Sequence, residues 1–360
     1  MKQAELVIIG GGPAGLCAAV SAARSGAKVL IIERNKDLGG QLLKQTHMFF
    51  GSEKQYASLR GIDIPAILIS ELEKYKERVE IIKEATVVGV FEDGVITVLE
   101  KEENYFKIAP KALVLATGAY EKYLSFPNND LPGIYGAGAV QTLMNVHGVK
   151  PGNKVLMVGA GNIGLIVSYQ LMQAGVKVEA ILDAAPKIGG YLVHASKVRR
   201  MGVPILTSHT VKEAIGKEEL EKAVISQVDE KFSPIEGSEK TLDVDVMCIS
   251  VGLTPLNELL AMRGCKMKYI PQLGGLVPLR NENYETSVEN LFVAGDATGV
   301  EEASAAMVEG FLAGLCAAEK IGYRLDNFEE MKNDYLKQLE ELRSGPAGKH
   351  ILSGIEQIVL

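Results

Sequence analysis

The chain has 360 residues, of which 47% are hydrophobic and 23% are charged, as in ordinary globular proteins. This length accommodates two domains with well-buried cores. The formal net charge of −7 argues against nucleic acid or an anionic membrane surface as the main partner.

The four cysteines, Cys17, Cys248, Cys265 and Cys316, lie far apart in the sequence, and none belongs to a CxxC pair. This pattern excludes a disulfide framework and a local redox dithiol, and it suits a reducing cytoplasm. The opening "MKQAELVIIGGG" enters a strand at once, so we expect no signal peptide and a cytoplasmic protein. The longest apolar stretch, "VLMVGAGNIGLIVSYQLM", is interrupted by glycines and predicts a strand, a turn and a helix instead of a transmembrane segment.

A phosphate-binding motif opens the chain. An apolar strand leads into Gly10-x-Gly12-x-x-Gly15, a small-residue helix follows, and a second apolar strand ends at Glu33, 23 positions after Gly10. Gly10 permits the tight turn, Gly12 lets the backbone approach a pyrophosphate, and Gly15 lets the helix pack closely on the strand. Glu33 is placed to accept hydrogen bonds from an adenosine ribose, so these elements together predict an adenine dinucleotide site.

The same motif recurs about 150 residues later. Gly159-x-Gly161-x-x-Gly164 follows an apolar strand, and Asp183 ends the next strand, 24 positions after Gly159. The two copies predict a flavoprotein that holds FAD in one domain and a nicotinamide nucleotide in the other.

The ligand of the second copy is less closely specified. Asp183 favours a free 2′-hydroxyl, and hence NAD over NADP. Arg199 and Arg200 follow one helix later, where they either reach a 2′-phosphate or form a solvated helix face. A site that holds only ATP or ADP has the same motif.

Two later segments carry further nucleotide-site signals. The strand in "ALVLATGAYE" runs into small residues at 116–118, where the chain can cross close to a nucleotide. The strand in "TSVENLFVAGDATG" ends at Asp296, whose carboxylate can accept hydrogen bonds from flavin-chain hydroxyls. The N-terminus of the next helix would favour negative charge on a reduced flavin ring.

These motifs, in the order GGGPAG, Glu33, GGQ, ATG, GAGNIG and AGD, resemble the flavoproteins with two dinucleotide-binding domains, of which thioredoxin reductase is the compact type. The resemblance covers roughly residues 1–323. It implies an α/β fold with two Rossmann-like domains, the second inserted into the first. The implied FAD domain is 1–118 plus 280–323, the nucleotide domain is 119–279, and 324–360 form a C-terminal helix and tail.

The resemblance also implies the binding positions. The expected FAD contacts are Gly10, Gly12, Pro13, Ala14, Gly15, Glu33, Arg34, Gly40, Gln41, Val87, Ala116, Thr117, Gly118, Asp296, Ser304 and Ala305. The expected contacts of NAD or another adenine nucleotide are Gly159, Gly161, Asn162, Ile163, Gly164, Asp183 and Gly252. No metal site is expected.

The Gly-Gly-Gln turn after the first motif is expected to run beside the isoalloxazine. Gly39 and Gly40 would keep the backbone clear of the ring, and Gln41 would present its amide to it. The alternative is a simple loop with a polar side chain.

No residue pair forms a strong acid–base constellation. Gln41, Lys44 and His47 are weak catalytic candidates, with a structural role as the alternative for His47. Phe49 and Phe50 either cover a flavin or pack in the core. Arg60 is the one plausible clamp for a substrate carboxylate, against the alternative of a surface residue.

The absence of CxxC separates this chain from thioredoxin reductases. The segments "GGQLLKQTHMFFGSEKQYASLRGIDI" and "ATGAYEKYLSFPNNDLPGIYGAGAVQTLMN" are similar to another branch, the large subunits of sarcosine oxidase, opine oxidase, hydrogen cyanide synthase and dye-linked proline dehydrogenase complexes. The resemblance implies an oligomer with a partner flavoprotein subunit, and FMN or a [2Fe–2S] cluster on or shared with a partner, such as a small iron–sulfur protein.

The segment 328–342 places apolar residues on one helical stripe, which predicts an amphipathic helix that docks on its own domain or forms a subunit interface. Three functions stay open. The chain is an FAD-dependent relay subunit of an amine or amino-acid dehydrogenase, a stand-alone NADH-dependent reductase that feeds a quinone or ferredoxin, or a non-catalytic nucleotide-binding subunit.

Overall fold

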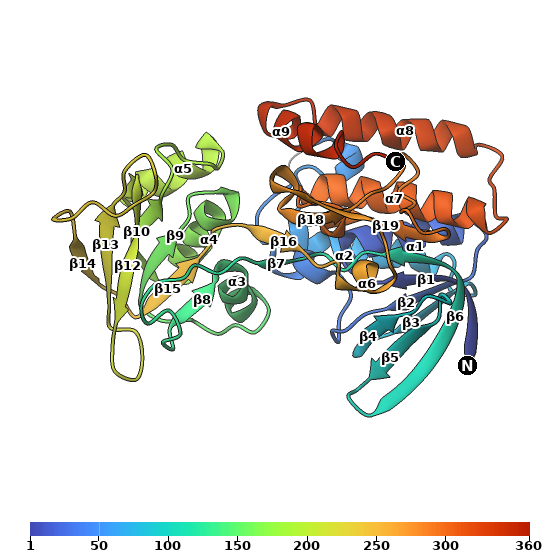
Figure 1. Cartoon of the computed structure of the whole chain (residues 1–360), viewed down its shortest axis with the longest axis horizontal. Coiled ribbons are helices and arrows are strands. Elements are labelled where there is room, and N and C mark those ends of the chain that lie inside the picture. Colours follow the sequence, from blue (N-terminus) through green and yellow to red (C-terminus); the bar gives the residue numbers. More distant parts are fainter. Residues whose placement is uncertain (50) are drawn as a thin grey trace. The chain divides into compact units, whose positions relative to one another are not determined.

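The computed structural model describes residues 1–49 and 51–360. The chain divides into two compact units (Figure 1). Unit 1 comprises residues 1–120 and 253–360, and unit 2 comprises residues 121–252. Unit 2 is thus inserted in unit 1, but residues 253–279, which the sequence analysis assigned to the inserted domain, belong to unit 1, and so does the C-terminal segment.

Unit 1 is built on a seven-stranded sheet. β1 (Lys2–Ile9), β2 (Val29–Ile32), β3 (Val79–Ile82), β6 (Asn104–Leu115) and β19 (Leu291–Val293) run parallel. β4 (Ala85–Val90) and β5 (Ile96–Glu100) extend the sheet as an antiparallel meander from the first half of β6. The order β3-β2-β1-β6 therefore places the carboxyl end of β1 beside the carboxyl ends of β2 and β6.

Both faces of the second half of β1, residues 6–9, are buried, which explains the continuous apolar sequence of this half. Leu6 and Ile8 face the core that contains α1 (Pro13–Ser25) and α7 (Ala303–Lys320), whereas Val7 and Ile9 face the core of the meander. The small residues of α1 and α7 have a packing cause: a Cβ on Gly310 would lie 2.1 Å from the Ala14 carbonyl oxygen. The two helix backbones therefore touch.

The remaining elements of unit 1 are short, apart from the two C-terminal helices. They are η1 (Gly40–Lys44), η2 (Glu53–Gln55), η3 (Gly61–Asp63), α2 (Ile64–Glu73), α6 (Glu258–Met262), β17 (Met267–Ile270), η4 (Pro271–Leu273), β18 (Gly275–Pro278) and η5 (Gly295–Ala297). β7 (Ala119–Glu121) and β16 (Leu253–Pro255) pair with each other where the chain crosses between the units.

The predicted C-terminal amphipathic helix is present as α8 (Phe328–Leu342), and it packs on its own unit. The ring of Tyr335 stacks on that of Phe311 in α7, with 5.6 Å between centroids. α9 (Pro346–Ile355) follows, and Ile358 is buried against the β17–β18 hairpin. This hairpin–tail contact is one reason why residues 253–279 belong to unit 1.

Unit 2 has a five-stranded parallel sheet in the order β11-β10-β9-β15-β8. Its strands are β8 (Ile134–Gly136), β9 (Lys154–Val158), β10 (Lys177–Asp183), β11 (Ile205–Thr207) and β15 (Val246–Ile249). One face packs on α3 (Ala137–Asn145), α4 (Asn162–Gln173) and α5 (Leu192–Arg200). The other packs on the antiparallel sheet of β12 (His209–Ile215), β13 (Lys222–Gln227) and β14 (Lys240–Asp243). No helix among the described residues is long and apolar enough to cross a bilayer.

Candidate cofactor sites

The first glycine motif joins β1 to α1. Gly10 adopts φ +107°, and a Cβ there would lie 2.3 Å from the Ala116 carbonyl oxygen. A Cβ on Gly15 would lie 1.8 Å from the Gly10 carbonyl oxygen. Both positions therefore exclude any larger residue, because backbone atoms occupy the space of the side chain.

Gly12 differs, because it faces open space. A Cβ there would meet, among the described residues, only the Cα of Gly40, at 3.9 Å. The Gly39 N–H donates to the Gly11 carbonyl oxygen at 2.8 Å and fixes the Gly-Gly-Gln turn across the motif. α1 starts with Pro13 and has no acidic residue in its first turn. Open space therefore remains beside Gly12 at the N-terminus of α1, where a phosphate group fits.

Glu33 is buried, with 5% of its surface exposed, directly behind this turn. Its Oε2 accepts the Gly11 N–H at 2.7 Å, and its Oε1 accepts the N–H and the side-chain amide of Asn35 at 2.8 and 2.7 Å. The carboxylate is therefore held in one orientation and keeps lone pairs for a ribose hydroxyl. Asn35 is a part of this arrangement that the sequence analysis missed.

The residues expected around the adenosine end lie in neighbouring elements. Val87 is buried in β4, and the Ala85 N–H that starts this strand donates to the Glu33 carbonyl oxygen at 2.9 Å. Arg34 is exposed. Residues 116–118 follow β6 and cross in front of Gly10, and Gly118 adopts φ +79°.

Asp296 lies just past β19, in η5. Its Oδ1 accepts the Glu301 N–H at a long 3.3 Å. Burial, together with the nearby carboxylates of Glu309, Glu301 and Glu302, raises the pKa of Asp296 to about 7. A carboxylate with so few donors fits a ligand that brings hydroxyl donors of its own. The next helix, α7, starts at Ala303 with no acidic residue in its first turn, and the expected contacts Ser304 and Ala305 are buried there.

A buried ionic network lies behind Asp296. Glu309, 3% exposed, accepts the Gly295 N–H at 2.9 Å, the Tyr284 hydroxyl at 2.8 Å and the Arg343 guanidinium at 2.6 Å. Neither Glu309 nor Arg343 was predicted from the sequence. A signal was present, since Glu309 is a lone charge in an otherwise apolar part of its helix.

Unit 2 repeats the geometry of the first motif. Gly159 adopts φ +113°, and its Cβ would lie 2.1 Å from the Ser250 carbonyl oxygen. A Cβ on Gly164 would lie 2.0 Å from the Gly159 carbonyl oxygen, whereas one on Gly161 would meet no described atom within 4 Å. Gly252, with φ +121°, follows β15 as Gly118 follows β6.

Asp183 has the role in unit 2 that Glu33 has in unit 1. Its Oδ2 accepts the Ala160 N–H and its Oδ1 accepts the Ala185 N–H, both at 2.9 Å. Asn162 starts α4, and its side-chain oxygen accepts the Tyr191 N–H at 2.8 Å. Ile163 is 38% exposed beside it. Arg199 and Arg200 are exposed in the last turn of α5, as a solvated helix face would be.

The weak catalytic candidates lie around η1. Gln41 is exposed and Lys44 is half-buried. The ring of His47 stacks on that of Phe49, with 6.0 Å between centroids, and Phe49 is buried in the core of unit 1. Phe50 lies outside the described residues. Arg60 is exposed, as expected of a surface residue.

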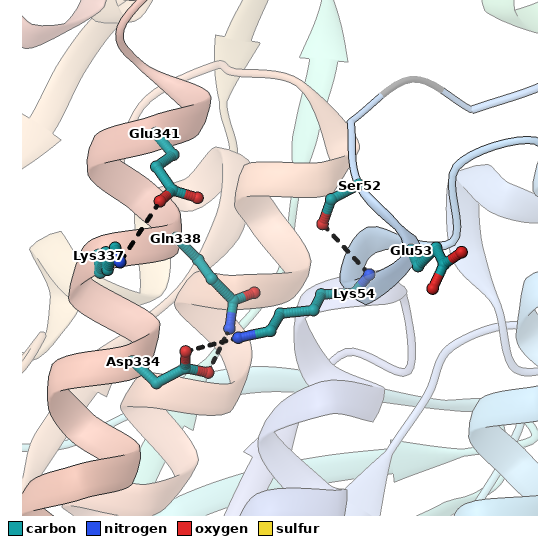
Figure 2. Close-up of a pocket in the computed structure, with 7 residues that line it drawn as sticks. All are labelled: Ser52, Glu53, Lys54, Asp334, Lys337, Gln338 and Glu341. Carbon is teal, nitrogen blue, oxygen red and sulfur yellow. Dashed lines mark hydrogen bonds and ion pairs between the residues drawn. The ribbon is translucent and has the colours of Figure 1, made fainter.

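A polar pocket lies elsewhere in unit 1, between η2 and α8 (Figure 2). Lys54 pairs with Asp334 at 2.6 Å, and Lys337 pairs with Glu341 at 3.9 Å. The pocket contains none of the expected cofactor contacts, and these charges pair with one another. We therefore assign it no ligand. No group of three or more potential metal ligands occurs among the described residues.

With both glycine motifs and their acids in place, residues 4–310 match the family model of the pyridine nucleotide-disulphide oxidoreductases. The chain belongs to this family. Membership implies binding of FAD and NAD(P), and the geometry of Gly12, Glu33 and Asp296 fits such a ligand.

Several curated relatives are named as subunits of enzymes. The chain is 26% identical to the alpha subunit of sarcosine oxidase from Corynebacterium sp. (strain P-1), over 89% of this chain and 33% of that protein. It is 26% identical to one of the subunits of opine oxidase from Agrobacterium tumefaciens, over 87% and 65%. It is 25% identical to the HcnB subunit of hydrogen cyanide synthase from Pseudomonas protegens, over 86% and 69%. The chain thus spans between about a third and two-thirds of the relatives' lengths.

Solved structures confirm the expected fold class. L-proline dehydrogenase from P. horikoshii matches with a TM-score of 0.73 at 24% identity, over 94% of this chain and 59% of that one. Thioredoxin reductase from T. acidophilum matches with a TM-score of 0.72 at 21% identity, over 89% and 99%. The chain therefore has the thioredoxin-reductase-like fold with two dinucleotide-binding domains.

Proposed function

We propose that this chain is the FAD-dependent, electron-relaying subunit of a multi-subunit amine or amino-acid dehydrogenase. The observation that carries the proposal is a mismatch between the fold and the cysteines. The fold is that of a thioredoxin reductase, but all four cysteines are unpaired and buried.

Burial raises the pKa of every one of these thiols: Cys17, Cys248, Cys265 and Cys316. Disulfide exchange requires a thiolate, and a thiol with a raised pKa in an apolar core supplies none near neutral pH. Electrons therefore leave the cofactor by a route other than an internal disulfide, and a redox group on another polypeptide is the route that we propose.

The residues of unit 1 divide the work of holding FAD. The N-terminus of α1 with Gly12 would take the diphosphate, Glu33 the adenosine ribose, and Asp296 the hydroxyls of the flavin chain. When bound, FAD accepts two electrons and passes them on one at a time.

Substrate oxidation belongs to a partner in this proposal. An amine oxidase holds its substrate against the flavin, commonly with an arginine on the carboxylate, and excludes water. The one arginine that the sequence suggested for this role, Arg60, is exposed. The relatives named as subunits support an assembly of several polypeptides. In this proposal, FMN or a [2Fe–2S] cluster lies on a partner flavoprotein or iron–sulfur protein.

The test compares the isolated chain with its native assembly. The isolated chain should release one FAD on denaturation and give no turnover with sarcosine, proline or hydroxyproline and a dye acceptor. A tagged copy recovered from its own cells should bring a partner flavoprotein and acquire turnover, with native mass spectrometry giving the stoichiometry. Robust turnover by the isolated chain would make it the dehydrogenase itself and refute the relay.

A second candidate, a stand-alone NADH-dependent reductase, is favoured by the carboxylate of Asp183 beside the second motif. Anaerobic stopped-flow mixing with NADH distinguishes the two. Rapid bleaching of the flavin, without any partner, supports the reductase. Slow bleaching by NADH, together with recovery of a partner flavoprotein, supports the relay subunit.

A further inference from the structure

We propose that Arg343, at the end of α8, is a positioning residue that holds the loop 295–302, and with it Asp296, in the shape that binds the flavin cofactor. The identity of the cofactor rests on the proposed function. Arg343 itself lies outside residues 4–310, which match the family model, so the family pattern does not supply this role.

Arg343 joins two carboxylates that otherwise lie on different segments. Its Nε and Nη2 donate to Glu301 at 2.9 and 2.7 Å, and Nη2 also donates to Glu309 at 2.6 Å. Glu301 belongs to the loop after η5, and Glu309 belongs to α7. The planar fork of a guanidinium suits this double contact, which a lysine could make only in part.

The two residues that Arg343 binds hold the loop in different ways, Glu309 through its carboxylate and Glu301 through its backbone N–H. Glu309 accepts the Gly295 N–H at 2.9 Å and the Thr298 hydroxyl at 3.2 Å. The Glu301 N–H donates to Asp296. Arg343 therefore orients the Glu309 carboxylate, which accepts the Gly295 N–H just before Asp296. It also anchors the side chain of Glu301, whose backbone N–H donates to Asp296, and it acts on Asp296 through these two residues.

The charges of the buried side chains give a second reason to expect that Arg343 holds the loop 295–302. The side chains of Arg343, Glu301 and Glu309 are only 6%, 12% and 3% exposed. Burial raises the pKa of Glu301, and Arg343 opposes this rise. The other nearby cation, Arg280, lies 3.9 Å from Glu309. Loss of Arg343 would leave buried carboxylates without their main cation, which is strongly unfavourable and would displace the loop that carries them.

The same helix has a second anchor at the segment that follows the Gly-Gly-Gln turn. Gln338 accepts the side-chain amide of Gln55 at 2.6 Å. Asp334 pairs with Lys54 at 2.6 Å (Figure 2). α8 therefore ties together 295–302 and the segment around η2, two parts of unit 1 far apart in the sequence.

The test uses the full chain with Arg343→Met, Arg343→Lys and a matched control, Arg324→Met. Arg324 also pairs with two glutamates, Glu319 and Glu329, but its side chain is 49% exposed. FAD affinity is measured by fluorescence at a temperature where every apo variant is fully folded, so that a change in stability alone does not alter it. We expect FAD binding to weaken at least tenfold in Arg343→Met, to recover partly in Arg343→Lys, and to stay within twofold of the parent in Arg324→Met.

Hydrogen exchange of the apo protein supplies a readout that needs no cofactor. Peptides covering 295–302 should exchange at least tenfold faster in Arg343→Met, while peptides of β1 and β6 keep their protection. Unchanged exchange in 295–302 would overturn the inference, and so would FAD affinity within twofold of the parent in a folded Arg343→Met variant. A parent chain that binds no FAD refutes the proposed function, and the exchange rates still decide the role of Arg343.

Discussion

In both units a carboxylate at the end of the second strand accepts the backbone N–H between the first two glycines of the motif. Glu33 accepts that of Gly11 at 2.7 Å, and Asp183 accepts that of Ala160 at 2.9 Å. The likeness continues into the next turn. The Gly39 N–H donates to the Gly11 carbonyl oxygen at 2.8 Å, and the Gly190 N–H donates to the Ala160 carbonyl oxygen at 2.9 Å.

The units differ in the residues that surround this shared glycine motif and its acid. Unit 1 places a further strand, a second helix N-terminus and Asp296 beside its motif, all from the part of the chain that returns after unit 2. Unit 2 has a strand and a helix in the equivalent place, because β8 pairs with β15 as β19 pairs with β6, and α3 follows β8. Residues 137–140, which follow β8, contain no acid that would correspond to Asp296. The added strand and helix are therefore common to both units, and the difference lies in Asp296, the acid that we propose for the flavin chain.

The largest effect should come from the third glycine of each motif. Gly15→Ala and Gly164→Ala should each lower the free energy of unfolding by roughly 3 kcal/mol or more, because the new Cβ would lie 1.8 or 2.0 Å from a backbone oxygen. Gly12→Ala and Gly161→Ala face open space and are the matched controls, with an effect within about 0.5 kcal/mol. Urea unfolding measures all four. A control as damaging as its partner would contradict the division between packing and ligand glycines.

Substitution of the two acids, Glu33 and Asp183, should lower the free energy of unfolding by different amounts. Glu33→Gln replaces one carboxylate oxygen with an amide donor that opposes a backbone N–H, and it should destabilise the apo chain by about 2–3 kcal/mol. Asp183→Asn, at a half-buried position, should cost about 1 kcal/mol. Equilibrium unfolding without nucleotide is the measurement. Equal losses would mean that the two carboxylates are equally buried in solution.

The carboxyl group of Asp296 should give unit 1 a pH-dependent contribution to stability. The pKa of Asp296 is raised to about 7 in the folded chain, chiefly by burial and then by Glu309, Glu301 and Glu302, whereas the unfolded value is near 4. The folded state therefore binds the proton more tightly, so this group's contribution to apo stability falls as the pH rises from about 4 to 7 and is constant above that.

The matched variant is Asp296→Asn. It should remove this pH dependence and make the apo chain more stable than the parent at pH 8, by about 1–3 kcal/mol. Urea unfolding between pH 5 and pH 8.5 measures both proteins. Parallel pH profiles for the parent and the variant would show that Asp296 is ionised throughout this range.

The smallest effects concern the second nucleotide. NADH should bind more tightly than NADPH, because the Asp183 carboxylate would accept ribose hydroxyls and repel a 2′-phosphate. Asp183→Ser should reduce the difference in affinity between NADH and NADPH. Arg199→Ala and Arg200→Ala should change either affinity by less than about 0.5 kcal/mol, since both side chains are exposed at the end of α5. Tighter binding of NADPH by the parent would assign the arginines to a 2′-phosphate.

Much of this structure can be predicted from local patterns in the sequence. Each glycine motif, its acid and the helix 328–342 depend on residues close together in the chain, and the structure has α8 at Phe328–Leu342. The limits of the inserted unit were missed because they depend on remote contacts, such as that of Ile358 with the β17–β18 hairpin. The pair Glu309–Arg343 was missed for the same reason, since 34 residues separate its members and only the fold brings them together.

The points where the chain leaves and re-enters each unit have a consequence for how such a protein can be rearranged. At the ends of unit 2, the Lys122 N–H donates to the Gly252 carbonyl oxygen at 2.9 Å, and in unit 1 the Leu256 N–H donates to the Gly118 carbonyl oxygen at 2.9 Å. Both units therefore have adjoining cut ends, the condition under which domain insertion and circular permutation are tolerated. A short linker from Gly118 to Leu256 should close unit 1 without stretching β6. Recombination can therefore insert, delete or exchange either unit without changing the strand pairing in the sheet of the other unit.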